Sequence, residues 1–340
     1  MKEIQSILRR IACESGPWVL ATLVSVEGSS YRRAGARALI APNGDRLGSI
    51  SGGCLEEDLM ARARQVAATA RPVVAIYDTT SENDLVWGVG LGCHGVVRVL
   101  LEPLTSDAPW LSHAGLALEG GPPCEIQVVW AAAAGGKLGT DLSEPSEAGS
   151  AAGVEAARPG IFRQRLSTPP LLLVCGAGDD AQPLVRWGAE LGWRVTVADP
   201  RPGYATAARF PAAQEVMSGP VTDLVEAVDP GPGAFVIIMT HHYLHDLPLL
   251  RALLPRPLAY LGLLGPRKRA AKLLETLEAE GMVITEAMRR RLFAPVGLDL
   301  GAEGPEEVAL SAVAEMQATL AGRNGRALRE RLGPIHDDRA

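Results

Sequence analysis

The stretch LLLVCGAGDDAQPLVRWGAELGWRVTVAD, residues 171–199, decides the fold of the carboxyl-terminal half of this chain. It begins with a short buried strand, continues as a helix over about 181–191 and ends in a second strand over 193–199. Strand, glycine turn, helix and strand within roughly 30 residues form a βαβ unit, whose two strands lie parallel in one sheet. Further apolar strands at 235–240 and 258–265 extend the predicted Rossmann-like parallel sheet.

The glycine turn of this unit reads GAGDDA. Its first glycine, Gly176, allows a tight turn, and Gly178 lets backbone N–H groups approach a phosphate at the helix N-terminus. Asp199, at the end of the next strand, is placed to accept hydrogen bonds from ribose hydroxyls. Because Asp179 and Asp180 bring two negative charges into the turn, a metal ion, a hydroxyl-rich ligand or a plain helix cap are alternatives to a nucleotide.

The loop after the strand at 235–240 reads THHYLHD. Doubly wound sheets bind ligands at the carboxyl ends of their strands, so we expect His241 to face the cleft. The three histidines of this loop, together with Asp246, are candidate metal ligands; the alternative is a helix N-terminus with exposed imidazoles. The three are His241, His242 and His245.

The amino-terminal half predicts an α+β unit with a mainly antiparallel or mixed sheet. Asn43-Gly44 between two apolar runs is a strong hairpin signal. The stretch at 139–160, rich in Gly, Ser and Glu, is typical of a flexible surface linker. The predicted helices are 2–12 and 55–70, and the predicted strands are 18–28, 36–42, 46–51, 72–78, 95–103, 124–132 and 160–166.

Two glycine-rich loops of this half carry groups suited to binding. The first, GSSYRRAG at 28–35, offers backbone donors, two hydroxyls and two guanidinium groups, a set that suits anions such as phosphate. The second places Cys54 after two glycines at the start of a helix, where the helix dipole makes a thiolate more available. The alternative for Cys54 is a small buried residue beside a tight turn. The candidate ligand-binding residues are Ser29, Ser30, Arg32, Arg33, Gly52 and Gly53.

A third glycine-rich loop, WGVGLGCHG at 87–95, holds Cys93 beside His94. Its four glycines predict a close approach of the backbone to another loop or to a ligand. The thiol and imidazole are a weak nucleophile signal, because sequence neighbours need not share the geometry that catalysis requires. Cys13, Cys124 and Cys175 lie in apolar surroundings and are predicted core residues.

Composition restricts the class of protein. A length of 340 residues suggests two or three domains, and a net charge of −6 argues against a general nucleic-acid or anionic-membrane binder. No apolar run approaches the ~20 residues that cross a bilayer, and the opening MKEIQSILRR lacks the apolar core of a signal peptide. Five scattered cysteines without a CxxC pair exclude a disulfide framework and give a structural zinc site little support. A cytoplasmic protein is expected.

These motifs together resemble the XdhC/CoxI family, the accessory proteins of molybdenum hydroxylases such as xanthine dehydrogenase. The GSISGGC and GLGCHG loops are the specific part of the match. The resemblance implies an α/β protein in which an N-terminal α+β domain precedes a Rossmann-like domain. It divides the chain into 1–105, an extension and linker at 106–167, the Rossmann-like domain at 168–300, and a helical segment and tail at 301–340. The matching segments are 28–59, 77–103, 171–202, 235–246, 260–269 and 295–316.

The resemblance also implies a function: a chaperone that binds molybdenum cofactor, promotes its sulfuration by a cysteine desulfurase and helps insert it into the apo-hydroxylase. It further implies a homodimer. Cys54 and Cys93 match the family's two glycine-loop cysteines, as soft ligands or sulfur relays. The Arg32 and Arg33 loop or the Gly176 turn would hold the phosphate end of the cofactor. Asp179, where many members have His, and His94, where many have Gly, indicate a subgroup serving a different hydroxylase.

Three other readings come from different classes of protein. An NAD(P)-dependent oxidoreductase would use the Rossmann-like turn and Asp199, with His241 as acid–base, but leaves the cysteine loops without a role. A nucleotide-sensing protein would bind nucleotide and no molybdenum. The chain could also be a subunit of the hydroxylase itself. This alternative is disfavoured, because the chain lacks the cysteine spacings of iron–sulfur domains and the length of a molybdenum-binding subunit.

Overall fold

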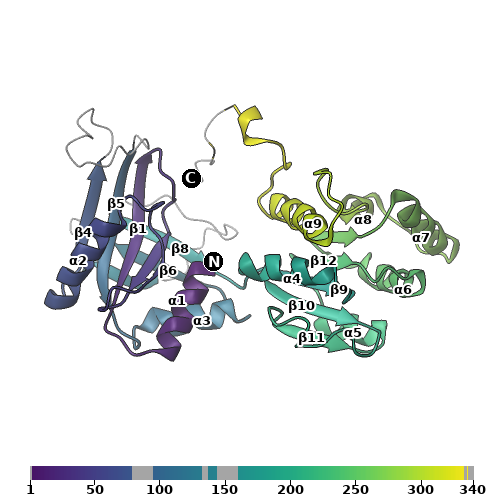
Figure 1. Ribbon diagram of the computed structural model, residues 1–340, viewed down its shortest axis with the longest axis horizontal. Coiled ribbons are helices and arrows are strands. Elements are labelled where there is room, and N and C mark those ends of the chain that lie inside the picture. The colour runs from purple at the N-terminus through teal and green to yellow at the C-terminus, as the bar shows by residue number, and fades with distance from the viewer. Residues whose placement is uncertain (1, 79–94, 132–136, 144–159, 333–334, 336–340) are drawn as a thin grey trace. The chain divides into compact units, whose positions relative to one another are not determined.

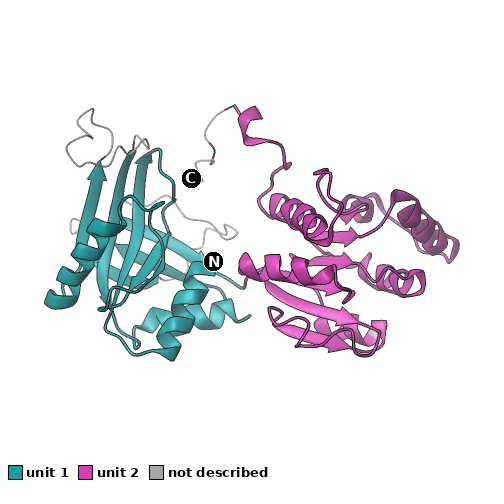
Figure 2. Ribbon diagram, viewed as in Figure 1, with its two compact units in different colours: residues 1–168, 336–340 teal, residues 169–335 magenta. Residues whose placement is uncertain are grey.

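The computed structural model describes residues 2–78, 95–131, 137–143, 160–332 and 335. The chain divides into two compact units, residues 1–168 with 336–340 and residues 169–335 (Figure 2). No helix among the described residues is long and apolar enough to cross a membrane.

Unit 1 is built on a five-stranded sheet in the order β3-β2-β1-β5-β4, in which every neighbouring pair is antiparallel (Figure 1). The Asn43-Gly44 hairpin between β2 and β3 is confirmed. The strands are β1 (Trp18–Gly28), β2 (Arg37–Ile40), β3 (Arg46–Gly48), β4 (Val73–Asp78) and β5 (Gly95–Leu104).

Both faces of this sheet are buried, which explains why β1 is almost continuously apolar. Val19, Ala21 and Leu23 alternate onto one face and pack against α2 (Glu56–Thr69). Leu20 lies on the opposite face, in a cluster with α1 (Lys2–Cys13), α3 (Pro109–Leu118) and a second sheet.

This second sheet has three antiparallel strands in the order β7-β6-β8: β6 (Cys124–Val129), β7 (Gly139–Ser143) and β8 (Ile161–Leu166). The linker predicted at 139–160 is therefore wrong at its start, since 139–143 is a strand; 144–159 lies outside the described residues. The reason is tertiary, because β7 gains its ladder from β6, and its Thr140 N–H donates to the buried Glu102 carboxylate at 2.8 Å. The helix α3 was not predicted.

Unit 2 confirms the predicted Rossmann-like architecture. Six strands pair in parallel in the order β11-β10-β9-β12-β13-β14. They are β9 (Leu171–Cys175), β10 (Arg194–Asp199), β11 (Glu215–Ser218), β12 (Phe235–Ile238), β13 (Tyr260–Leu263) and β14 (Leu292–Phe293).

Helices cover both faces of this parallel sheet (Figure 1). One face packs against α4 (Ala181–Glu190) and α9 (Pro305–Leu320). The other packs against α5 (Val221–Val228), α6 (Tyr243–Leu253) and α7 (Arg267–Ala279); a short α8 (Glu286–Arg291) precedes β14. The chain winds outward from β9 in one direction and from β12 in the other, so the topological switch point, where such folds bind ligands, lies between these two strands.

Candidate functional site

The turn after β9 needs its first glycine because another backbone passes close to it. Gly176 has φ +127°, and a Cβ there would stand 2.5 Å from the carbonyl oxygen of Met239, which follows β12. At Gly178 a Cβ would stand 2.5 Å from Oδ1 of Asp180. The glycines predicted for phosphate approach thus also let β9, β12 and the Asp180 carboxylate pack together.

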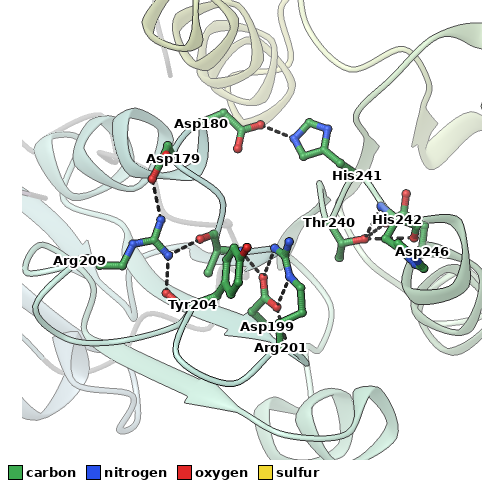
Figure 3. Close-up of polar contacts among 11 residues, drawn as sticks. Asp179, Asp180, Asp199, Arg201, Tyr204, Arg209, Thr240, His241, His242 and Asp246 are labelled. Carbon is green, nitrogen blue, oxygen red and sulfur yellow. Dashed lines mark hydrogen bonds and ion pairs between the residues drawn. The ribbon is translucent and has the colours of Figure 1, made fainter.

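Asp180 and His241 meet across the switch point (Figure 3). Oδ2 of Asp180 lies 2.6 Å from Nε2 of His241, although the two residues follow different strands. The His241 backbone is left-handed, with φ +59°, and its side chain is 60% exposed. The prediction that His241 faces the cleft is consistent with this position at the carboxyl end of the sheet.

Asp199 lies at the end of β10, as predicted, but its carboxylate is completely buried. Oδ2 accepts from the Ala177 N–H at 2.6 Å and from Nη2 of Arg201 at 2.7 Å. Oδ1 accepts from the N–H and Nε of Arg201 at 2.8 and 2.9 Å. Burial alone would raise the pKa of Asp199, but the Arg201 and Ala177 hydrogen bonds outweigh it, so the pKa lies below its ordinary value. A ribose hydroxyl would have to compete with Arg201.

Asp179 has a cationic partner that the sequence reasoning missed. Nη2 of Arg209 lies 2.7 Å from Oδ1 of Asp179, and Nη1 of Arg209 donates to the Ala177 carbonyl at 2.7 Å. The centroid of the Tyr204 ring lies 3.9 Å from the Arg201 guanidinium carbon. The sequence feature that could have indicated this partner is the segment RPGYATAARF at 201–210, shortly after β10, which contains both arginines and the tyrosine.

The histidine loop does not assemble the predicted metal ligands. The His241 ring is hydrogen-bonded to Asp180, while the rings of His242 and His245 contact each other at a tilt, with centroids 4.7 Å apart and planes 41° apart. Asp246 is buried and accepts from Oγ1 of Thr240 and from Nη2 of Arg269, each at 2.5 Å. Across the described residues, no group of three or more His, Cys, Asp or Glu side chains is arranged to hold a metal ion.

In unit 1, the loop that carries Cys54 is organised by the Glu56 carboxylate. Oε1 of Glu56 accepts from the Ser51 N–H at 3.0 Å, and Oε2 accepts from the Leu55 N–H at 3.2 Å. Ser51 Oγ donates to Glu56 Oε2 and accepts from the Gly53 and Leu55 N–H groups at 3.2 and 3.1 Å. Cys54 itself is exposed, which argues against a small buried residue at this position. The prediction that Cys13 is a core residue is wrong, because it is also exposed, whereas Cys175 is buried as predicted.

The loop at 28–35 touches the Cys54 loop. Nη1 of Arg32 donates to the Ser49 carbonyl at 3.0 Å and to Oε1 of Glu3 at 2.7 Å. A Cβ at Gly52 would stand 3.6 Å from the ring of Tyr31. Arg32 is thus already engaged within the fold; Ser29 and Arg33 are exposed and Ser30 is half-buried.

Cys93 and the third glycine-rich loop lie outside the described residues. The residues flanking the three loops share one end of the five-stranded sheet. Gly28 at the end of β1 pairs with Gly95, and Asp78 at the end of β4 pairs with Val96. Because β3 is antiparallel to β2, Gly48 also leaves the sheet toward this end.

The fold and these loops define a class: a protein with an antiparallel-sheet unit bearing a cysteine on a glycine-rich loop and a separate Rossmann-type unit. Family profiles match both units, "XdhC and CoxI family" at residues 12–78 and "XdhC Rossmann domain" at residues 172–316. The chain belongs to the XdhC and CoxI family.

Similar proteins cover nearly the whole chain. A probable xanthine dehydrogenase subunit of Bacillus subtilis is 34% identical over 314 residues, 88% of this chain and 92% of that protein. "Molybdenum cofactor insertion chaperone PaoD" of Escherichia coli is 25% identical over 298 residues, 88% of this chain and 82% of PaoD. A crystal structure described as a xanthine dehydrogenase from Bacillus halodurans has a TM-score of 0.78 and 31% identity, covering 95% of this chain and 97% of that one.

Proposed function

We propose that this protein binds molybdenum cofactor, promotes its sulfuration and helps insert it into the apo-form of a xanthine dehydrogenase or CO dehydrogenase-type molybdenum hydroxylase. The observation that carries the proposal is the near full-length likeness to a molybdenum cofactor insertion chaperone. The exposed Cys54 on an ordered glycine-rich loop supports it. The partners are the apo-hydroxylase and a cysteine desulfurase, and the protein acts in the cytoplasm as a homodimer, as the family resemblance implies.

Cys54 is suited to the metal end of the cofactor. A thiolate is a soft ligand for molybdenum and the attacking group in sulfur exchange. In such an exchange, Cys54 attacks the outer sulfur of a desulfurase persulfide; a new S–S bond forms at Cys54 and the desulfurase thiolate leaves. Apart from the neighbouring residues in the chain, no described atom lies within 4 Å of the position that a Cβ would take at Gly53, so there is open space beside the residue that precedes Cys54. Cys93 is proposed for the same role.

Two places suit the phosphate end of the cofactor. The exposed Arg33 offers a guanidinium group on the loop beside the Cys54 loop, and Ser29 and Ser30 supply hydroxyl groups on the same loop. The turn at Gly176 and Gly178 is the second place, and suits a cofactor that carries a nucleotide. Within this turn, Asp179 is paired with Arg209, whose positive charge reduces the repulsion that a phosphate would meet, and Asp180 is hydrogen-bonded to His241.

The alternative, an NAD(P)-dependent oxidoreductase, fits the strand order and the position of His241. It fits Asp199 less well, because four hydrogen bonds from the chain already occupy the carboxylate that would hold the ribose. The two readings differ in a direct assay: the oxidoreductase requires saturable nicotinamide binding and hydride turnover, which the chaperone does not.

The proposal is tested by producing a molybdenum hydroxylase together with this protein and measuring hydroxylase activity and its terminal sulfur. Cys54→Ser and Cys93→Ser should each lower activity, whereas Cys13→Ser, at another exposed cysteine, should not. Full activation by both glycine-loop variants removes the thiols from the mechanism. Full activation without this protein rejects the accessory role itself.

A further inference from the structure

Glu56 occupies an unusual position for a carboxylate, because it reaches back over the residues that precede its own helix. It is the first residue of α2 and is buried. Its two oxygens accept from two different backbone N–H groups, Ser51 on Oε1 and Leu55 on Oε2. Arg46 lies 3.6 Å from Oε1 and offsets part of the cost of burying the charge.

The serines before the glycines complete the same arrangement. Ser49 Oγ lies 2.8 Å from Oε1 of Glu56, and Ser51 Oγ contacts Oε2. Through Ser51 Oγ, the network extends to the Gly53 N–H at 3.2 Å. The segment that includes Gly52, Gly53 and Cys54 is therefore fixed on both sides, while the three residues themselves stay exposed.

We infer that Glu56 is a positioning residue that holds the Cys54 thiol in the orientation that receives the cofactor. The inference rests on the proposed function, in which Cys54 contacts the molybdenum end. The two glycines that precede Cys54 would otherwise leave the thiol on a flexible segment, because glycine loses more conformational freedom on ordering than any other residue. A pre-ordered donor binds better than one that must be ordered on binding.

The chemistry of the network requires a carboxylate. Both oxygens of Glu56 face fixed backbone donors, and an amide has one acceptor oxygen and an NH₂ group that cannot accept. Glu56→Gln is nearly isosteric and therefore breaks one of the two backbone contacts without opening a cavity. The adjacent Glu57 is exposed on the same helix, so Glu57→Gln removes the same charge and serves as the matched control.

The first measurement is amide hydrogen exchange of the 49–56 segment in the full chain without cofactor. Losing one hydrogen bond should speed exchange in Glu56→Gln by about tenfold, and Glu57→Gln should stay within about twofold of wild type. Ser51→Ala, which removes the hydroxyl link to Gly53, should also speed exchange. Wild-type protection in Glu56→Gln overturns the inference.

The second measurement is molybdenum and pterin content of the purified protein for Glu56→Gln, Cys54→Ser and the double variant, with unfolding midpoints recorded for each. If Glu56 acts through Cys54, Glu56→Gln lowers the content severalfold and adds no further loss in the Cys54→Ser background. Losses that multiply in the double variant indicate a merely structural role and overturn the inference. If Cys54→Ser alone loads like wild type, the assigned role of the thiol fails instead, while the exchange measurement still decides whether Glu56 orders the loop.

Discussion

Asp180 and His241 join the carboxyl ends of two neighbouring parallel strands, with 2.6 Å between Oδ2 of Asp180 and Nε2 of His241. The pair spans the switch point between β9 and β12, so a ligand held at the glycine turn would lie next to it. His241 has a left-handed backbone, and its ring contacts Asp180, whereas the rings of His242 and His245 contact each other at a tilt.

That backbone conformation predicts the order of stability of two His241 variants. His241→Gly and His241→Ala both remove the contact with Asp180, but only alanine carries a Cβ into a φ of +59°. The glycine variant should be more stable than the alanine variant by about 1 kcal/mol. Urea unfolding of the two variants measures the difference, and equal stability would show that the left-handed conformation is not kept in solution.

Gly176 should tolerate no side chain. A Cβ at this position would stand 2.5 Å from the Met239 carbonyl oxygen. Any substitution would also force an L-residue into a backbone conformation with φ +127°. Gly176→Ala should therefore lower the free energy of unfolding of unit 2 by roughly 3 kcal/mol. Gly203→Ala is the control, because its φ is +79° and no described atom lies within 4 Å of its added Cβ. It should cost only about 1 kcal/mol. Similar losses in both variants would contradict the close approach of β9 and β12.

The Asp199 and Arg201 pair should make unit 2 sensitive to acid. Since the pKa of Asp199 is lowered in the folded state, its stabilisation is fully present above the ordinary value of 3.8 and is lost as the pH falls through the lowered pKa. Asp199→Asn should cost about 2 kcal/mol at neutral pH, less than a fully buried pair because Arg201 is partly exposed. Between pH 6 and pH 3, the difference in the free energy of unfolding between wild type and Asp199→Asn should become smaller. A difference that stays constant over this range would contradict the lowered pKa of Asp199.

Unit 1 contains buried opposite charges whose interaction a double-mutant cycle can measure. Burial lowers the pKa of Arg37 to about 10 and raises the pKa of Glu102, and each charge favours ionisation of the other. Arg37→Met alone should cost about 3 kcal/mol, because it leaves the Glu102 carboxylate without its cation. The double variant Arg37→Met/Glu102→Gln should lose about 1–2 kcal/mol less of the free energy of unfolding than the sum of the losses in the two single variants. Strict additivity would show that the two charges do not interact.

The sequence predicted most elements because their signals are local. The apolar β1, the Asn43-Gly44 hairpin and the βαβ unit around Gly176 are each indicated by residues close together in the chain. The strand β7 was missed because its residues, GTDLS, carry no apolar pattern and it is held by pairing with β6. A strand stabilised by its neighbour leaves little trace in its own residues.

The candidate site was predictable in position but not in its partners. The sequence placed Asp199, His241 and Cys54 at the ends of strands or the start of a helix, where the structure has them. It did not reveal that Arg201 satisfies Asp199, that Asp180 pairs with His241, or that Glu56 fixes the Cys54 loop. These partners depend on side-chain directions that strand and helix spacing does not determine.

The most direct test of the proposed function is the content of molybdenum and pterin in the protein purified from cells that make molybdenum cofactor. The wild-type chain should carry both in constant proportion, and Cys54→Ser should carry severalfold less while Cys13→Ser matches wild type. A wild-type chain that carries neither, under conditions in which an apo-hydroxylase in the same cells is loaded, would contradict the proposal that this protein is a carrier of the cofactor.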